Sequence, residues 1–106
     1  MYNIVFSSEA IKDLEETKAY ITEELCSEQA ATKTVSKILK DIHMLSKFPE
    51  SGPSLSVIVN FDTNYRYLVC RNYVAFYRLE ENKVRIVRIL YGRRNFMQIL
   101  FGEPQE

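Results

Sequence analysis

The sequence predicts an α+β domain in which two helices form an antiparallel hairpin on one face of a mostly antiparallel sheet. Two observations carry this prediction. From Ile11 to Leu45, apolar residues recur at three- and four-residue spacing, which is the period of an amphipathic helix. After Pro53 the chain changes to aromatic and β-branched runs, which are typical of strands. The 106 residues contain no glycine- or proline-rich linker, so we expect a single domain over residues 1–106.

The first half of the chain predicts a short strand followed by the two helices. The β-rich run Tyr2–Phe6 stops at Ser7 and Ser8, which are well suited to cap a helix, and Ser27 is the next candidate cap. The apolar stripes of the two helices are Ile11, Leu14, Ile21 and Leu25, and then Ala31, Val35, Ile38, Ile42 and Leu45. Pro49 disfavours helical geometry at the preceding residue, so the hairpin should end near Phe48.

The second half predicts three or four strands. The strong runs are Tyr65–Cys70, Tyr73–Leu79 and Val84–Leu90, Ser56–Val59 is a candidate for a further strand, and we expect the N-terminal strand to join the same sheet. Arg71-Asn72 and Glu80–Lys83 are the natural hairpin turns, since asparagine tolerates left-handed geometry.

Strand alternation predicts which side chains share a face. It places Arg66 with Leu68 and Cys70 on one side, and Tyr65, Tyr67 and Val69 on the other. Arg85 and Arg88 are three residues apart, so in a regular strand they point to opposite faces. The helices cover one face of the sheet, and the sequence shows no obvious cover for the other.

Positive charge is divided by residue type along the chain. All seven arginines fall between Arg66 and Arg94, whereas six of the seven lysines lie in the first half. Residues 1–53 carry six Lys against nine Asp or Glu, a net charge of −3, and residues 54–106 carry eight Lys or Arg against five, a net of +3. The second half therefore predicts a basic functional face, with an ordinary solvated sheet surface as the alternative.

The segment from Arg88 to Arg94 is the sharpest local signal. It runs out of a strand into Gly92 and the adjacent pair Arg93 and Arg94, with Tyr91 before them. Such a strand end could clamp a phosphodiester through guanidinium groups, with Tyr91 in proton transfer. The alternative is that Tyr91 packs as an ordinary aromatic and the arginines form a solvated rim.

The remaining candidates are weaker. His43 is the only histidine and lies beside a helical stripe, and Glu50 is a possible base only if its loop folds over the sheet. Cys26 and Cys70 have no metal-ligand spacing, so we expect reduced thiols, no metal and no cofactor. The apolar tail Phe96–Phe101 either docks on the domain's own core or leaves a patch for a partner. The start of the chain lacks a signal peptide and no stretch could span a membrane, so we expect a cytoplasmic protein.

Seven segments in this order resemble the RelE/ParE superfamily of toxins from type II toxin–antitoxin modules. They are Ser8–Glu16, Tyr20-Ile21, Ala30-Ala31, Phe48–Gly52, Tyr65-Arg66, Tyr73–Arg78 and Val87–Arg94. No single segment is specific, but together they cover nearly the whole chain. The resemblance implies a small toxin that arrests bacterial growth and is neutralised by a cognate antitoxin.

The superfamily has two functional branches. In the RelE branch, whose members are ribosome-dependent mRNA endonucleases, an arginine usually stands where this chain has Val74, and a lysine often stands at Leu68. Arg94 fits that branch, Tyr91 stands where some relatives carry histidine, and the later catalytic tyrosine is replaced by apolar residues around Leu100. The chain is more similar to the ParE branch, whose members poison DNA gyrase, through its long hairpin, its Phe-Pro-x-x-Gly turn and its Val-x-Phe-Tyr strand.

The resemblance implies different site residues for each of the possible functions. A gyrase poison needs a binding surface for the gyrase–DNA complex and for the antitoxin, with Arg66, Arg88, Arg93, Arg94, Phe96 and Phe101 as its candidates. A ribonuclease acting on mRNA at the ribosome would use Arg66, Arg88, Tyr91 and Arg94 as catalytic residues. A non-toxic adaptor that binds an acidic partner is the third hypothesis. We favour gyrase, because the acid–base set that RNA cleavage requires is incomplete.

Overall fold

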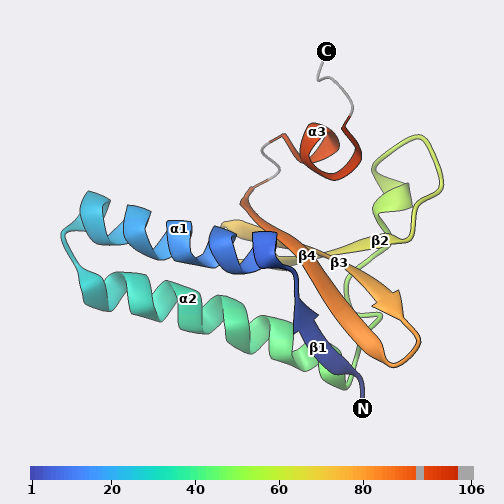
Figure 1. Cartoon of the computed structure of the whole chain (residues 1–106), viewed down its shortest axis with the longest axis horizontal. Coiled ribbons are helices and arrows are strands. Elements are labelled where there is room, and N and C mark those ends of the chain that lie inside the picture. The colour runs from blue at the N-terminus through green and yellow to red at the C-terminus, as the bar shows by residue number, and fades with distance from the viewer. Residues whose placement is uncertain (93–94, 103–106) are drawn as a thin grey trace.

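The structure is a computed structural model that describes residues 1–92 and 95–102. Its order is strand, two helices, three strands and a short final helix (Figure 1), which confirms the predicted α+β architecture. The elements are β1 (Asn3–Phe6), α1 (Ser8–Leu25), α2 (Glu28–His43), the 3-10 helices η1 (Met44–Ser46) and η2 (Leu55–Val57), β2 (Tyr65–Cys70), β3 (Tyr73–Glu80), β4 (Lys83–Tyr91) and α3 (Phe96–Phe101). The sheet has four strands in the order β1-β4-β3-β2, and only the β1–β4 pair is parallel.

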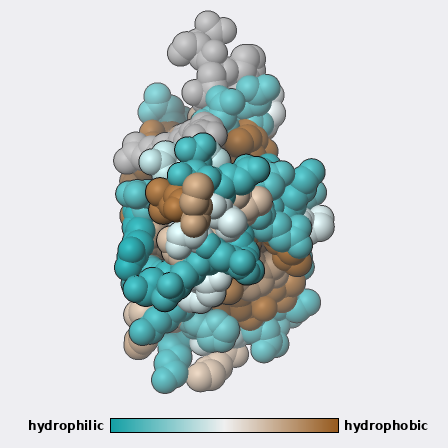
Figure 2. Space-filling view, turned by 90° about the vertical axis from the view of Figure 1, so that its left-hand side faces the viewer, coloured by the Kyte–Doolittle hydropathy of each residue, from teal (hydrophilic) through white to brown (hydrophobic). Residues whose placement is uncertain are grey.

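The helical hairpin is defined by its serine caps. The Oγ atoms of Ser7 and Ser27 each accept a hydrogen bond at 3.0 Å, from the backbone N–H of Ala10 and Ala30 respectively. Each serine thus satisfies a donor that the first helical turn leaves unpaired. Cys26 turns the chain between the helices in left-handed geometry, with φ 48°. The hairpin extends well beyond the sheet (Figure 1), and the view onto its tip shows a mostly hydrophilic surface with separated apolar patches (Figure 2).

The main core lies between the hairpin and one face of the sheet, which we call the helix face. Ile38 and Ile42 of α2 and Leu45 of η1 are fully buried there. Their partners from the sheet are Ala75, Tyr77, Val84, Ile86 and Ile89. Leu68 and Tyr73 also contribute to this core, so the helix face is closed to solvent over most of its area.

A second core covers one half of the opposite face, which we call the outer face. Leu55, Val59 and Phe96 pack there against Val74, Phe76 and Leu90. The rings of Phe96 and Phe76 are stacked, with centroids 5.6 Å apart. The expectation that the outer face has no cover is therefore wrong for this half, and the tail docks on the domain's own core.

The expected strand at Ser56–Val59 is also wrong. This segment begins in η2, and Ser54 makes only an isolated antiparallel bridge with Arg66. Ser54 caps the turn by accepting a hydrogen bond from the backbone N–H of Ser56 at 3.2 Å. Leu55 and Val59 are the buried residues, and their four-residue spacing suits a helical turn rather than a strand.

The register of β3 and β4 corrects the expected directions of two arginines. Arg85 lies across from Arg78, and Arg88 lies across from Phe76. Arg78 and Phe76 are two residues apart in β3 and point to the outer face, so Arg85 and Arg88 share that face as well. The expectation of opposite faces is wrong because the register shifts between Phe76 and Tyr77, where β4 contains one extra residue, Val87.

The other predictions about the strands are confirmed. Arg66, Leu68 and Cys70 lie across from the helix-face residues of β3, so they share that face. Both hairpin turns form between the expected strands, but the left-handed residue of the first turn is Arg71, with φ 59°.

Candidate interaction surface

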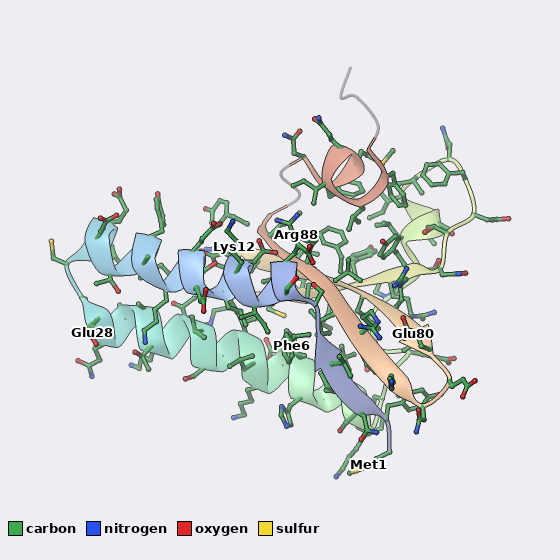
Figure 3. The ribbon with its side chains drawn as sticks, in the orientation of Figure 1. Met1, Phe6, Lys12, Glu28, Glu80 and Arg88 are labelled. Atoms are coloured by element: carbon green, nitrogen blue, oxygen red, sulfur yellow. The ribbon has the colours of Figure 1, made fainter. Side chains whose placement is uncertain are left out.

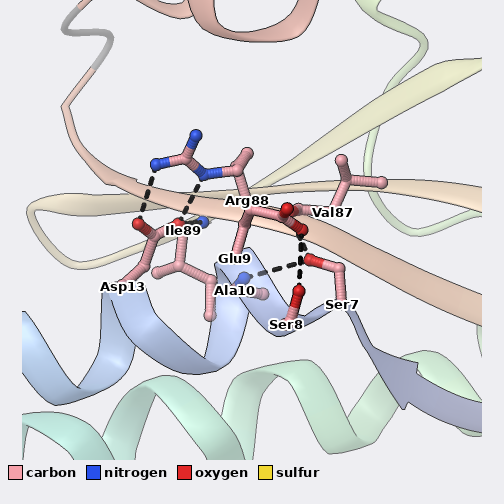
Figure 4. A network of polar contacts seen from close by, with 8 residues as sticks. All are labelled: Ser7, Ser8, Glu9, Ala10, Asp13, Val87, Arg88 and Ile89. Atoms are coloured by element: carbon pink, nitrogen blue, oxygen red, sulfur yellow. Dashed lines mark hydrogen bonds and ion pairs between the residues drawn. The ribbon is translucent and has the colours of Figure 1, made fainter.

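The carboxylate of Asp13 in α1 forms an ion pair with the guanidinium of Arg88 at the edge of β4 (Figure 4). The Nε and Nη2 atoms of Arg88 donate to the two carboxylate oxygens of Asp13 at 2.8 and 2.9 Å, and the backbone N–H of Ile89 donates to one of them at 2.9 Å. The side chain of Asp13 is only 8% exposed, so this is a largely buried two-point ion pair. The hydrogen bonds to Asp13 raise the pKa of Arg88 further, which keeps the guanidinium charged.

The first turn of α1 covers the same edge of β4. The backbone N–H of Ser7 donates to the carbonyl oxygen of Ile86 at 2.9 Å, and its hydroxyl donates to that of Val87 at 2.7 Å (Figure 4). These contacts begin where the pairing of β1 with β4 ends, at Phe6 and Ile86. Ser7 and Asp13 therefore satisfy backbone groups that β1 leaves open and join α1 to the sheet edge.

A cleft of about 460 Å³ opens beside this junction. Its walls come from α1, the ends of β3 and β4, and α3, and its lining residues are Asp13, Glu16, Thr17, Tyr20, Tyr73, Arg88, Ile89, Leu90, Tyr91 and Ile99. Tyr20 and Tyr91 are 61% and 52% exposed. The rings of Tyr91 and Tyr73 meet edge to face with centroids 5.4 Å apart. The cleft therefore combines apolar and phenolic walls with a charged pair, which suits an amphipathic segment of another protein.

Arg66 lies elsewhere and holds a loop. Its Nε donates to the carbonyl oxygen of Gly52 at 2.7 Å, and its Nη2 donates to that of Glu50 at 3.2 Å. The buried hydroxyl of Tyr77 donates to the carbonyl oxygen of Pro49 at 2.8 Å and accepts from the N–H of Gly52 at 3.0 Å. Arg66 and Tyr77 thus fix the loop after the hairpin against the helix face, and burial raises the pKa of Tyr77.

Glycine is required at position 52 by this arrangement. A Cβ there would overlap the carbonyl oxygen of Tyr67 and would lie 2.7 Å from the hydroxyl oxygen of Tyr77. Glu50, the candidate base, is exposed, and its described bond is through its backbone carbonyl.

The remaining candidates are distributed over the molecule. Tyr91 lies in the cleft with Arg88 of β4, whereas Arg66 lies on the helix face of the edge strand β2, so Arg66 and Arg88 are not brought together. Phe96 is buried in the second core, and Phe101 packs edge to face on Phe61 and Tyr65 at centroid distances of 5.1 and 5.4 Å. Arg93 and Arg94 lie outside the described residues.

Two arginines that were not among the candidates form a cluster on the uncovered half of the outer face. Arg78 and Arg85 lie directly across from each other and share the carboxylate of Glu80. The distances to its Oε2 are 2.8 Å from Arg85 Nε and 3.4 Å from Arg78 Nη2. The guanidinium of Arg78 also lies over the ring of Tyr65, 5.7 Å from its centroid. Regular strand alternation from the turn after Glu80 places Arg78 and Arg85 on the same face, and the bulge at Val87 adds Arg88 to that face.

Over the described parts of the chain, no three His, Cys, Asp or Glu side chains are grouped as metal ligands. His43 is exposed at the end of α2. Both cysteines are free thiols, with Cys26 exposed and Cys70 buried. Within residues 1–92 and 95–102, no helix is long and apolar enough to cross a membrane.

The fold and the cleft define a small α+β protein with a surface suited to binding another macromolecule. Residues 4–96 match a family model described as the ParE toxin of the type II toxin–antitoxin system parDE. The chain therefore belongs to the ParE toxin family, as its sequence resemblance indicated.

A solved structure shares the fold. It is described as the chromosomal ParDE toxin–antitoxin system from P. aeruginosa, and it is 20% identical in sequence with a TM-score of 0.74. The match covers 87% of this chain and 97% of the other. No curated protein matches the chain.

Proposed function

We propose that this ParE-family toxin arrests bacterial growth by inhibiting DNA gyrase and is neutralised by a cognate antitoxin. Family membership supports the toxin class. The observation that favours gyrase over mRNA as the target is the separation of Arg66 from Arg88. RNA cleavage by attack of a 2′-hydroxyl requires an acid, a base and charge stabilisation at one phosphate. Here Arg66 holds a backbone loop and Arg88 holds a buried carboxylate.

The antitoxin is proposed to occupy the cleft between α1, β4 and α3. Its wall offers the exposed rings of Tyr20 and Tyr91, the apolar side chains of Leu90 and Ile99, and the carboxylate of Glu16. A helix or an extended segment with an apolar side could bury these rings, and exposed tyrosines are effective anchors at such interfaces.

Purified toxin tests the target. We expect micromolar toxin to inhibit supercoiling by gyrase and to leave gyrase-linked, cleaved plasmid. Unimpaired supercoiling, together with new mRNA ends after induction in cells, would instead establish a ribosome-dependent endonuclease. Normal growth on expression without the antitoxin would favour an adaptor.

Two variants test the antitoxin site. Tyr20→Ala and Tyr91→Ala should each weaken antitoxin binding by about tenfold or more, since a buried aromatic anchor contributes about 2 kcal/mol. Phe48→Ala is the matched control, because Phe48 is also an exposed aromatic, 59% accessible, but lies outside the cleft. An equal loss of antitoxin affinity in all three variants, or no loss in any of them, would place the antitoxin elsewhere.

A further inference from the structure

The uncovered half of the outer face carries an excess of positive charge. Arg78 lies across from Tyr65 on one side and from Arg85 on the other, and Lys83 lies across from Glu80 in the next row. We define Arg78, Lys83 and Arg85 as the cationic cluster. Figure 3 labels Glu80, near the turn that joins β3 and β4. Three cations therefore face one carboxylate on these strands.

We propose that the cationic cluster binds the phosphate backbone of DNA. The inference rests on the proposed function, since a gyrase–DNA complex presents DNA phosphates beside the protein that the toxin is proposed to inhibit. It assigns a second contact to the toxin, separate from the cleft proposed for the antitoxin.

The hydrogen bonding of the cluster supports this assignment. Like charges directly opposite each other in a sheet repel, and among the described residues the carboxylate of Glu80 is the one acid paired with Arg78 and Arg85. The Nε atom of Arg78 is buried and, among the described residues, has no hydrogen-bond partner. An external phosphate cannot reach this buried atom, but it would supply acceptor oxygens for the exposed parts of both arginine side chains and would reduce their repulsion.

The surroundings favour phosphate over a protein segment. Arg88 shares this face by register, but its guanidinium is already paired with Asp13, so the available charge is that of the cluster. The side chains of Arg78 and Arg85 are 40% and 32% exposed. The cleft with apolar and tyrosine walls lies instead between α1, β4 and α3. A cationic strand surface without such a cleft suits DNA, whose backbone binding depends mainly on charge.

Salt-dependent DNA binding tests the proposal. The toxin alone is titrated into a fluorescent duplex of about 30 base pairs, long enough for several toxin molecules, and anisotropy is measured between 20 and 200 mM salt. We expect weak binding by the wild type that decreases as salt rises. In the double variant Arg78→Gln/Arg85→Gln, the slope of log K against log salt should fall by about 1.8, because each lost phosphate contact removes about 0.9.

The control for net charge is Lys33→Gln/Lys40→Gln, which removes the same charge from exposed positions on α2. This variant should keep the wild-type slope. Absence of salt-dependent binding by the wild type, or an equal loss in the control, overturns the proposal.

The variant Glu80→Gln distinguishes an effect on DNA binding from a defect in folding. Removing the carboxylate that competes for Arg78 and Arg85 should strengthen DNA binding, and a misfolded protein cannot produce that gain. Unchanged or weaker binding in this variant contradicts the proposal. If the arginine double variant keeps its DNA affinity but loses antitoxin affinity, the cluster binds an acidic protein segment and the proposal is wrong.

The gyrase assay separates this proposal from the proposed function. A wild-type toxin that inhibits gyrase without binding DNA refutes the DNA surface alone. A toxin that binds DNA through the cluster and leaves supercoiling unchanged refutes gyrase as the target alone.

Discussion

The arginines on the two faces of the sheet have different kinds of hydrogen-bond partner. On the helix face, Arg66 donates to two backbone carbonyl oxygens of a loop. On the uncovered half of the outer face, Arg78 and Arg85 share the partly exposed carboxylate of Glu80. The register of β4 places Arg88 on the outer face, but its guanidinium extends to the sheet edge and pairs there with Asp13. The surroundings of each arginine, and not its residue type, decide whether its donors hold the fold or remain available to a partner.

The largest expected contrast is in the reactivity of the two thiols. Cys70 lies on the helix face, and burial raises its pKa from 9.0 to about 12, which reduces its thiolate about 1000-fold at neutral pH. Iodoacetamide at pH 8 should therefore modify Cys26 at the exposed hairpin turn and leave Cys70 unmodified, with one adduct by mass spectrometry. In denaturant both thiols should react. Rapid double labelling of the native protein would show that the helix face opens readily.

The same thiol predicts a pH dependence with a definite sign. A raised pKa in the folded state means that folding favours the protonated thiol, so its contribution to stability is complete below the unfolded value of 9.0. That contribution should decrease as pH rises from 9.0 toward about 12. In Cys70→Ala, the free energy of unfolding should therefore decrease less between pH 9.0 and about pH 12 than it does in the wild type.

The next contrast compares Arg88 with Arg85. Arg88→Gln leaves the buried carboxylate of Asp13 with only the N–H of Ile89, so it should reduce the free energy of unfolding by about 3 kcal/mol. Urea unfolding followed by circular dichroism measures this change. Arg85→Gln is the matched control on the same strand. Similar losses in both variants would contradict the division between structural and available arginines.

Tyr77→Phe tests the loop that Arg66 holds. Removing the hydroxyl leaves the N–H of Gly52 and the carbonyl oxygen of Pro49 without their partner, at a cost of about 2 kcal/mol. Tyr20→Phe, which changes an exposed phenol, should leave the unfolding midpoint unchanged. A neutral Tyr77→Phe would mean that water replaces the hydroxyl and that the loop is less tightly fixed than its geometry indicates.

Local sequence signals predicted most of the fold. The serine caps, the two apolar helical stripes and the three long strands depend on neighbouring residues, and each lies close to its expected place. The segment after Ser54 was mispredicted because the short apolar run Ser56–Val59 fits a strand or a helical turn equally well.

The arrangement of charged residues was harder to predict, because it depends on contacts between distant parts of the chain. Asp13 and Arg88 are 75 residues apart, and their pairing follows from α1 crossing the edge of β4. The bulge at Val87 has no glycine or other turn residue to mark it in the sequence, yet it places Arg88 on the same face as Arg85. The basic functional face stays a prediction, and the sequence pattern did not single out Arg78 and Arg85, which are partly exposed on the outer face.

The smallest expected effect is the stability change on altering Glu80. The side chain of Glu80 is partly exposed, and the hydrogen bond from Arg85 lowers its pKa below the ordinary value of 4.5. A lowered folded-state pKa means that the pairing stabilises the fold above that value and that the contribution is lost as pH falls. Glu80→Gln should therefore leave the urea midpoint at pH 7 nearly unchanged, because exposed pairs contribute little, and should flatten the decline in stability below pH 4.5. A large loss at pH 7 would show that Glu80 holds the sheet together, and Arg78 and Arg85 would then belong with Arg66 and Arg88 as structural arginines.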